Sequence, residues 1–269
     1  MTNQVDNWQY DPLVTFKCTI GNQFEILMLI EMLELRGISV MSANTDGIVC
    51  LIPVELEQEY YNVCHEWERL VGNDKMGQLE YTDYKELWQT SVNDYLAIGV
   101  DGKVKTKGDF NKDMPLQKNK SYRIVPIAIE EYIVNGKPVE ETIRNHRNIY
   151  DFCAGAKSSN DYYYEGVDKK TGHKNVYNKV IRYYISNKGE KLFKIKQAYS
   201  EKKGRDRTQL EAGYDHQTIF NKSWFPDKWE EYGINEKYYI DECYKILDRL
   251  EPEKARDRKI KQSGALTLF

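Results

Sequence analysis

The sequence predicts an α+β protein in which antiparallel strand pairs pack beside helices. Two short segments, Asn44-Thr45-Asp46-Gly47 and Asp101-Gly102, each lie between runs rich in β-branched residues. Asn, Asp and Gly tolerate the positive φ angles of tight turns, so each segment predicts a β-hairpin. Between the two hairpins, residues 54–71 repeat apolar side chains at helical spacing above an acidic opposite face, which is typical of an amphipathic helix.

Local signals also predict the elements at the start of the chain. Residues 23–35 are apolar over most of the surface of a helix, so we expect a buried helix there. Gly37 is placed to end this helix in a left-handed conformation. Residues 38–43 and 48–52 then form the two strands of the first hairpin.

The rest of the chain alternates between strand and helix signals. We expect strands between residues 79 and 107, a strand pair joined by a turn at 187–190, and a helix at 236–250. The segment NKDMPLQKNK is polar, lysine-rich and broken by proline. This composition favours a domain boundary, which we place between residues 112 and 113.

Composition restricts the class of protein. The 269 residues are 41% hydrophobic, which suits one large domain or two modest ones. The five cysteines lie far apart without a CxxC pair, so we expect reduced thiols. The most apolar run is broken by glutamates, and the N-terminus lacks the pattern of a secretory signal. We therefore expect a cytoplasmic protein without a membrane segment.

The charges are distributed unevenly along the chain. A net charge of -3 argues against a general coat for nucleic acid. Residues 182–207 nevertheless carry nine bases against three acids, and residues 103–123 are also basic. Such stretches either bind a polyanion or form a solvated face, and the charges alone leave both alternatives open.

The first hairpin lies in a segment that resembles a known family. Turn chemistry alone explains Asn44, Asp46 and Gly47. The run DPLVTFKCTIGNQFEILMLIEMLELRGISVMSANTDGIV, however, resembles phage-type family B DNA polymerases, where a helix precedes the hairpin that carries palm motif C. The usual form of that motif is Asp-Thr-Asp, and Asn44 replaces its first Asp here.

Further segments resemble the same family in the same order. SVNDYLAIGVDGKVKTKGDF is similar to the palm strands that grip the primer, and KNKSYRIVPIAIEEYIVNGKPVEETI to the start of the thumb. RYYISNKGEKLFKIK resembles a thumb hairpin. The resemblance implies that an antiparallel palm sheet with packed helices occupies residues 1–112 and a mixed α/β thumb residues 113–255, with a C-terminal tail at 256–269.

The resemblance implies a catalytic role for the first turn. Asp46 would be a metal-binding carboxylate of a two-metal phosphoryl-transfer site, with Asn44 as a positioning residue and Thr45 between them. Two Mg²⁺ ions in such a site activate the primer 3′-hydroxyl and stabilise the leaving pyrophosphate.

DNA contacts follow from the same resemblance. Tyr95 occupies the tyrosine position of the family's Lys-x-Tyr motif, whose lysine position is Asn93 here. Lys105, Lys107 and Gly108 resemble the downstream Lys-Gly element, where a glycine lets the backbone approach the duplex. The alternative for this segment is an ordinary exposed hairpin with solvated lysines.

The thumb and the tail add two further sets of candidates. The thumb would hold DNA phosphates through Arg182, Lys188, Lys191 and Lys194. The tail QSGALTLF resembles a peptide that binds a sliding clamp, although a tail packed on its own domain explains it equally well. Its anchor residues would be Gln262, Ala265, Leu266, Leu268 and Phe269.

Several parts of a complete polymerase are absent from the sequence. No motif A aspartate, fingers helix or exonuclease pattern is found. A single carboxylate cannot hold two Mg²⁺ ions, so the chain alone should not polymerise DNA. We therefore expect a split polymerase whose partners are primer–template DNA, deoxynucleoside triphosphates, a second chain with the absent parts and, through the tail, a sliding clamp. The alternatives are a non-catalytic DNA-binding or clamp-tethering subunit and a fragment of a longer protein.

Overall fold

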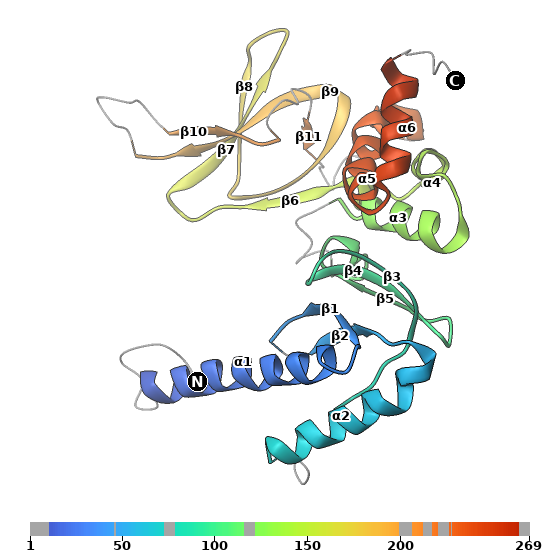
Figure 1. The fold of residues 1–269 in the computed structure, drawn as a ribbon. Helices are drawn as coiled ribbons and strands as arrows, with labels where there is room; N and C mark the ends of the chain where they lie inside the picture. Colours follow the sequence, from blue (N-terminus) through green and yellow to red (C-terminus); the bar gives the residue numbers. More distant parts are fainter. Residues whose placement is uncertain are drawn as a thin grey trace. The chain divides into compact units, whose positions relative to one another are not determined.

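The computed structural model describes residues 11–45, 47–72, 79–115, 122–198, 206–211, 217–219, 226 and 228–263. These residues form helices and antiparallel sheets, which confirms the expected α+β class (Figure 1). The chain divides into two compact units. Unit 1 comprises Met1–Lys85 and Gly99–Asp101, and unit 2 comprises Glu86–Ile98 and Gly102–Phe269. The two units are defined by contacts between residues, whereas the boundary expected between residues 112 and 113 separates palm from thumb. The two divisions answer different questions, so the palm and thumb boundary stays a prediction.

Unit 1 combines two helices with the first hairpin. Its elements are α1 (Pro12–Glu34), β1 (Ser39–Ala43), β2 (Ile48–Leu51), the short 3₁₀ helix η1 (Val54–Leu56) and α2 (Glu57–Leu70). The Asp11 carboxylate accepts hydrogen bonds from the backbone N–H groups of Leu13 and Val14, so α1 begins earlier than expected. Gly37 has a φ of 80°, as predicted for the residue that ends the helix.

A small apolar core holds unit 1 together. Its buried members are Leu29, Leu33, Ile38, Val63, Cys64 and Trp67. The indole N–H of Trp67 donates to the backbone carbonyl of Glu25 at 2.7 Å, which fixes α2 against α1.

Within this chain, the burial expected for the apolar helix at residues 23–35 is found only in part, and its burial against a second chain stays a prediction. Among the described residues of α1, only Leu29 and Leu33 are buried. The side chains of its outer stripe are 45% to 65% exposed; they are Leu13, Phe16, Ile20, Phe24 and Leu27. The reason is that α1 packs on α2 and β1 along one side only, so apolarity does not imply a partner within the same unit.

A three-stranded antiparallel sheet follows in the order β3-β4-β5. Its strands are β3 (Tyr84–Ser91), β4 (Asp94–Gly99) and β5 (Val104–Lys107). β4 and β5 form the second predicted hairpin, and Gly102 in its turn has a φ of 81°. The 3₁₀ helix η2 (Gly108–Phe110) continues directly from β5.

The helices of unit 2 form one layer around a tyrosine-rich core. They are α3 (Ile124–Asn135), α4 (Val139–Asn145), the 3₁₀ helices η3 (Ile149–Phe152) and η4 (Trp229–Tyr232), α5 (Glu236–Leu250) and α6 (Pro252–Ser263). The helix expected at 236–250 is confirmed as α5, and the Asn235 side chain caps it by accepting from the Tyr238 N–H at 3.1 Å. In the core, the Tyr239 hydroxyl donates to the Phe152 carbonyl at 2.8 Å and accepts from the Ile185 N–H at 2.8 Å.

The large sheet of unit 2 is organised around one long strand, β9 (Val180–Lys196). The sheet order is β10-β9-β7-β8, and β6 and β11 also pair with β9. The other strands are β6 (Ala154–Lys157), β7 (Tyr162–Asp168), β8 (Lys174–Tyr177), β10 (Arg207–Gln209) and β11 (Gln217–Ile219).

The turn predicted at 187–190 is wrong, because β9 runs through these residues without a break. Its first half pairs with β6 and β11, and its second half with β7 and β10. Each half thus finds strand partners elsewhere in the chain, while Gly189, with a φ of 128°, allows the strand to bend between them.

The sheet is strongly curled. A straight strand of the length of β9 would span about 55 Å. Yet the two ends of β9 meet the same short loop: the Ser158 N–H donates to the Lys179 carbonyl at 2.9 Å, and the Gln197 N–H donates to the Asp161 carbonyl at 2.7 Å. β9 must therefore curve back on itself, as its curved arrow in Figure 1 shows.

Candidate functional site

The β1–β2 hairpin forms as the sequence predicts. Ala43 pairs with Ile48, and the Asn44 N–H donates to the Gly47 carbonyl at 2.9 Å, which closes the turn. Asn44 and Thr45 lie at its tip, and Asp46 lies outside the described residues. The hairpin is confirmed, whereas the catalytic role of its turn stays a prediction.

The described residues do not by themselves supply the ligands of a two-metal site. No group of three His, Cys, Asp or Glu side chains in the described part of the chain lies together in a way that could hold a metal ion. Two Mg²⁺ ions need several oxygen ligands each, largely carboxylates. A two-metal site would therefore need carboxylates beyond those that the described residues bring together.

The β4–β5 hairpin brings three predicted DNA contacts onto one face. Tyr95 pairs directly with Lys107, and Ala97 pairs with Lys105. Because opposed residues share a face and alternate residues repeat it, Tyr95, Lys105 and Lys107 project from the same side of the sheet. Both lysines are exposed and Tyr95 is half-buried.

The other face of this hairpin packs into the core of unit 2. Leu96 is fully buried there, with Ile98 and Val104 packed against the same cluster. The core therefore fixes which way the hairpin faces, and Tyr95 and the two lysines point away from it. We call Tyr95, Lys105 and Lys107 the outer face of the β4–β5 hairpin.

Gly108 has a structural role that the sequence did not reveal. It has a φ of 62°, and a Cβ atom there would lie 2.8 Å from Asp94 Cγ and would also clash with the Asn93 carbonyl oxygen. This space is filled because Asp94 Oδ1 accepts from the Asp109 N–H at 3.0 Å. Glycine is thus required for the approach of this backbone to the β3–β4 turn, while its approach to DNA stays a prediction.

Asp94 is the carboxylate that organises this contact. The Ser91 hydroxyl, then the Asp109 N–H and the Arg249 charge, lower the pKa of Asp94 from its usual value. The ionised carboxylate therefore joins the β3–β4 turn to the start of η2, directly after Lys107.

The predicted thumb residues do not form a single surface. Lys191 and Lys194 lie three residues apart on β9 and therefore on opposite faces. Lys188 is exposed and its side chain lies against Gly233. Arg182 pairs with Gly155 in the other half of the strand, where its side chain is partly buried. This arrangement does not support contacts between all four side chains and one DNA backbone.

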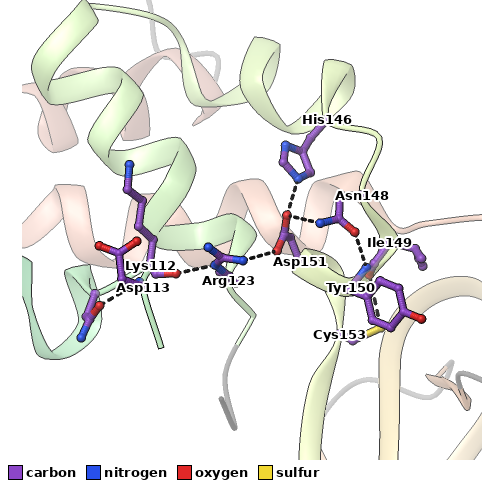
Figure 2. A network of polar contacts seen from close by, with 10 residues as sticks. Lys112, Asp113, Arg123, His146, Asn148, Ile149, Tyr150, Asp151 and Cys153 are labelled. Carbon is purple, nitrogen blue, oxygen red and sulfur yellow. Dashed lines mark hydrogen bonds and ion pairs between the residues drawn. The ribbon is translucent and has the colours of Figure 1, made fainter. Parts of the chain in front are cut away.

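A polar network joins the segment before α3 to the start of the large sheet (Figure 2). Asp151, which is 3% exposed, accepts from Asn148 Nδ2 at 2.9 Å and from Arg123 Nη1 at 3.4 Å, and His146 Nε2 lies 2.7 Å from its carboxylate. Arg123 Nε also donates to the Lys112 carbonyl. The network ties residues after the β4–β5 hairpin to α3 and η3, so its role is to position these elements.

A second carboxylate, half-buried and missed from the sequence, accepts hydrogen bonds from three tyrosines. The hydroxyls of Tyr122 and Tyr183 donate to Glu211 Oε1 at 2.9 Å, and the hydroxyl of Tyr238 donates to Oε2 at 3.1 Å. Burial, together with the Glu211 charge, raises the pKa of each tyrosine, so the hydroxyls stay protonated and donate. Because the three tyrosines are far from Glu211 in sequence, no local pattern could have indicated the cluster.

The tail and the apolar helix leave two predictions untested. Gln262 lies in α6, whereas Ala265, Leu266, Leu268 and Phe269 lie outside the described residues. By length and composition alone, α1 is long and apolar enough to cross a membrane. Only 6% of its most apolar 18-residue stretch is buried. Length and composition do not separate a membrane helix from one that packs on protein.

Neither a protein-family model nor a curated protein matches this chain.

Proposed function

We propose that this chain is the palm and thumb part of a template-directed DNA polymerase. It would add nucleotides to a primer 3′-hydroxyl only together with a second chain that supplies motif A, the fingers and the exonuclease. In this assembly Asp46 would be one metal-binding carboxylate of a two-metal site, and the second chain would provide the other.

The observation that carries the proposal is the outer face of the β4–β5 hairpin. Tyr95, Lys105 and Lys107 were selected from the sequence as primer contacts, and cross-strand pairing brings them together on one face, where both lysines are exposed. Two cations beside a tyrosine suit the phosphates and sugars of a DNA strand.

The exposed apolar surface of unit 1 supports the need for a second chain. In addition to the outer stripe of α1, four other large apolar side chains of unit 1 are exposed: Leu35, Met41, Leu51 and Val54. Among the residues that the structure describes, β1 and β2 form a two-stranded sheet with no further strand at either edge. Large exposed apolar patches mark interaction sites, and a two-stranded sheet is marginally stable by itself.

DNA contact at the β4–β5 hairpin is tested by binding of a fluorescent primer–template duplex. We expect the double variant Lys105→Ala/Lys107→Ala to bind several-fold more weakly and to lower the salt slope by about 2, since each phosphate contact releases close to one counterion. Lys137→Ala removes one cation between α3 and α4, a half-buried lysine 3.7 Å from the Glu141 carboxylate, and is the control. Equal losses in the two proteins would contradict the proposed contact.

Polymerase activity is tested by co-expression with a candidate second chain that carries motif A and fingers. We expect the two chains to purify together and to extend a primer with Mg²⁺, and each chain alone to be inactive. Stable co-purification and DNA binding without extension would instead favour the non-catalytic DNA-binding or clamp-tethering subunit.

A further inference from the structure

One face of the large sheet carries a row of charged and aromatic side chains across four strands. Arg207 on β10 pairs with Ile195 on β9 and reaches over the neighbouring Phe193. Phe193 pairs directly with Glu165 on β7, and Lys174 on β8 pairs with Val167, two residues after Glu165. Neighbouring strands are about 4.8 Å apart, and the row runs diagonally across them because Arg207 and Lys174 are offset in opposite directions. Lys191 also lies on this face, two residues before Phe193.

The buried carboxylate of Glu165 holds the two outer cations in place. Arg207 Nη2 lies 3.2 Å and Lys174 Nζ 3.8 Å from Glu165 Oε1. The Glu165 side chain is 11% exposed, whereas those of Arg207 and Lys174 are 41% and 62% exposed. One acid thus orders two cations that remain accessible, and with Lys191 the face keeps an excess of positive charge.

The guanidinium of Arg207 is stacked on an aromatic ring. Its Cζ atom lies 3.5 Å from the centre of the Phe193 ring, while Lys191 Nζ lies 6.0 Å from the same centre. Stacking on Phe193 and pairing with Glu165 hold the guanidinium as a flat plate above the sheet. The Arg207 side chain is 41% exposed, so solvent reaches the guanidinium in addition to its contacts with Phe193 and Glu165.

The row lies on the face of the sheet that points away from the core. Tyr164 and Leu192, the neighbours of Glu165 and Phe193 in sequence, point the opposite way and are buried in the core of unit 2. Val176, which pairs with Glu165 on the same face as the row, is 71% exposed. Solvent therefore reaches this face at β8, whereas Ile195 on the same face of β9 is buried.

We propose that this face binds single-stranded nucleic acid, with an unpaired base stacked on Arg207 and phosphates held by Lys174 and Lys191. A flat guanidinium beside two cations suits a strand in which bases and phosphates alternate. A paired base in a duplex could not reach the plate, and an acidic peptide would not need it. The site is separate from the primer contacts proposed on the β4–β5 hairpin and goes beyond them.

Fluorescence anisotropy of a labelled oligo-dT strand with the full chain tests the proposal. We expect Arg207→Lys, which keeps the charge and loses the plate, to weaken binding about tenfold. Lys174→Ala should lower the salt slope by about 0.7, the value for one phosphate of a single strand. Lys196→Ala, on the opposite face of β9, is the control and should stay within about twofold of the parent.

Folding and the proposed primer site are checked separately. Phe193→Leu keeps an apolar side chain and removes the ring, so a folded Phe193→Leu protein with weakened oligo-dT binding would support stacking. Unchanged binding in both Arg207→Lys and Phe193→Leu would overturn the proposal, as would equally strong displacement by poly-glutamate. Lys105→Ala/Lys107→Ala should leave oligo-dT binding unchanged. The proposed primer contacts and the proposed single-strand site can therefore be refuted independently of each other.

Discussion

The substitution Gly108→Ala tests the local structure that orients the outer face of the β4–β5 hairpin. A methyl group there must adopt a φ of 62° and would displace both Asp94 and the Asn93 carbonyl. The left-handed conformation costs an alanine about 1 kcal/mol. Moving Asp94 also weakens its hydrogen bonds with Ser91 and Asp109, each contributing about 1 kcal/mol. The expected loss of stability is about 2 to 4 kcal/mol.

Gly102→Ala is the matched control, since it isolates the cost of the backbone conformation. Gly102 has a φ of 81° in the turn of the same hairpin, and no atom lies within 4 Å of the position of its missing Cβ. We therefore expect Gly102→Ala to cost only about 1 kcal/mol. Urea unfolding followed by circular dichroism measures both variants. Losses that agree within about 0.5 kcal/mol would refute the role assigned to the contact with Asp94.

Further predictions concern unit 1 and the pH dependence of stability. Leu33→Ala should destabilise the protein by about 2 to 4 kcal/mol because it opens a cavity in the core, whereas Phe24→Ala on the outer stripe of α1 should change stability by less than about 0.5 kcal/mol. Urea titrations of both variants check this, and a large effect of Phe24→Ala would show that the stripe is covered in the free chain. The folded-state pKa of Asp94 is lowered, so its contribution to stability is present above an ordinary Asp pKa of about 3.9 and is lost as the pH falls through the lowered value. Asp94→Asn should therefore flatten the acid limb of a plot of unfolding midpoint against pH, and an unchanged limb would contradict the assignment.

Elements with local signals could be predicted from the sequence. Both hairpins depend on turn residues such as Gly102, and α5 depends on a cap and a helical repeat, so each is specified within a few residues. β9 could not be predicted in the same way. Asn187 to Glu190 look like a turn, but the partners of each half of the strand come from other parts of the chain.

The candidate sites show the same limit. Tyr95 and Lys107 could be paired from the sequence because one short hairpin brings them together. Arg207 and Lys174 meet only through Glu165 and a sheet of four strands, so charge alone could not select them. The apolar surface of α1 was recognised, but in this chain only Leu29 and Leu33 are buried, since apolarity does not say which molecule provides the partner.

The most direct test of the proposed function is the rate of single-nucleotide incorporation by the two-chain complex with Mg²⁺. We expect Asp46→Ala to leave assembly and primer binding unchanged and to lower the rate by at least about a thousandfold, since a metal ligand contributes several kcal/mol to the transition state. Assembly with a rate within about tenfold of the parent would contradict the proposed role of Asp46.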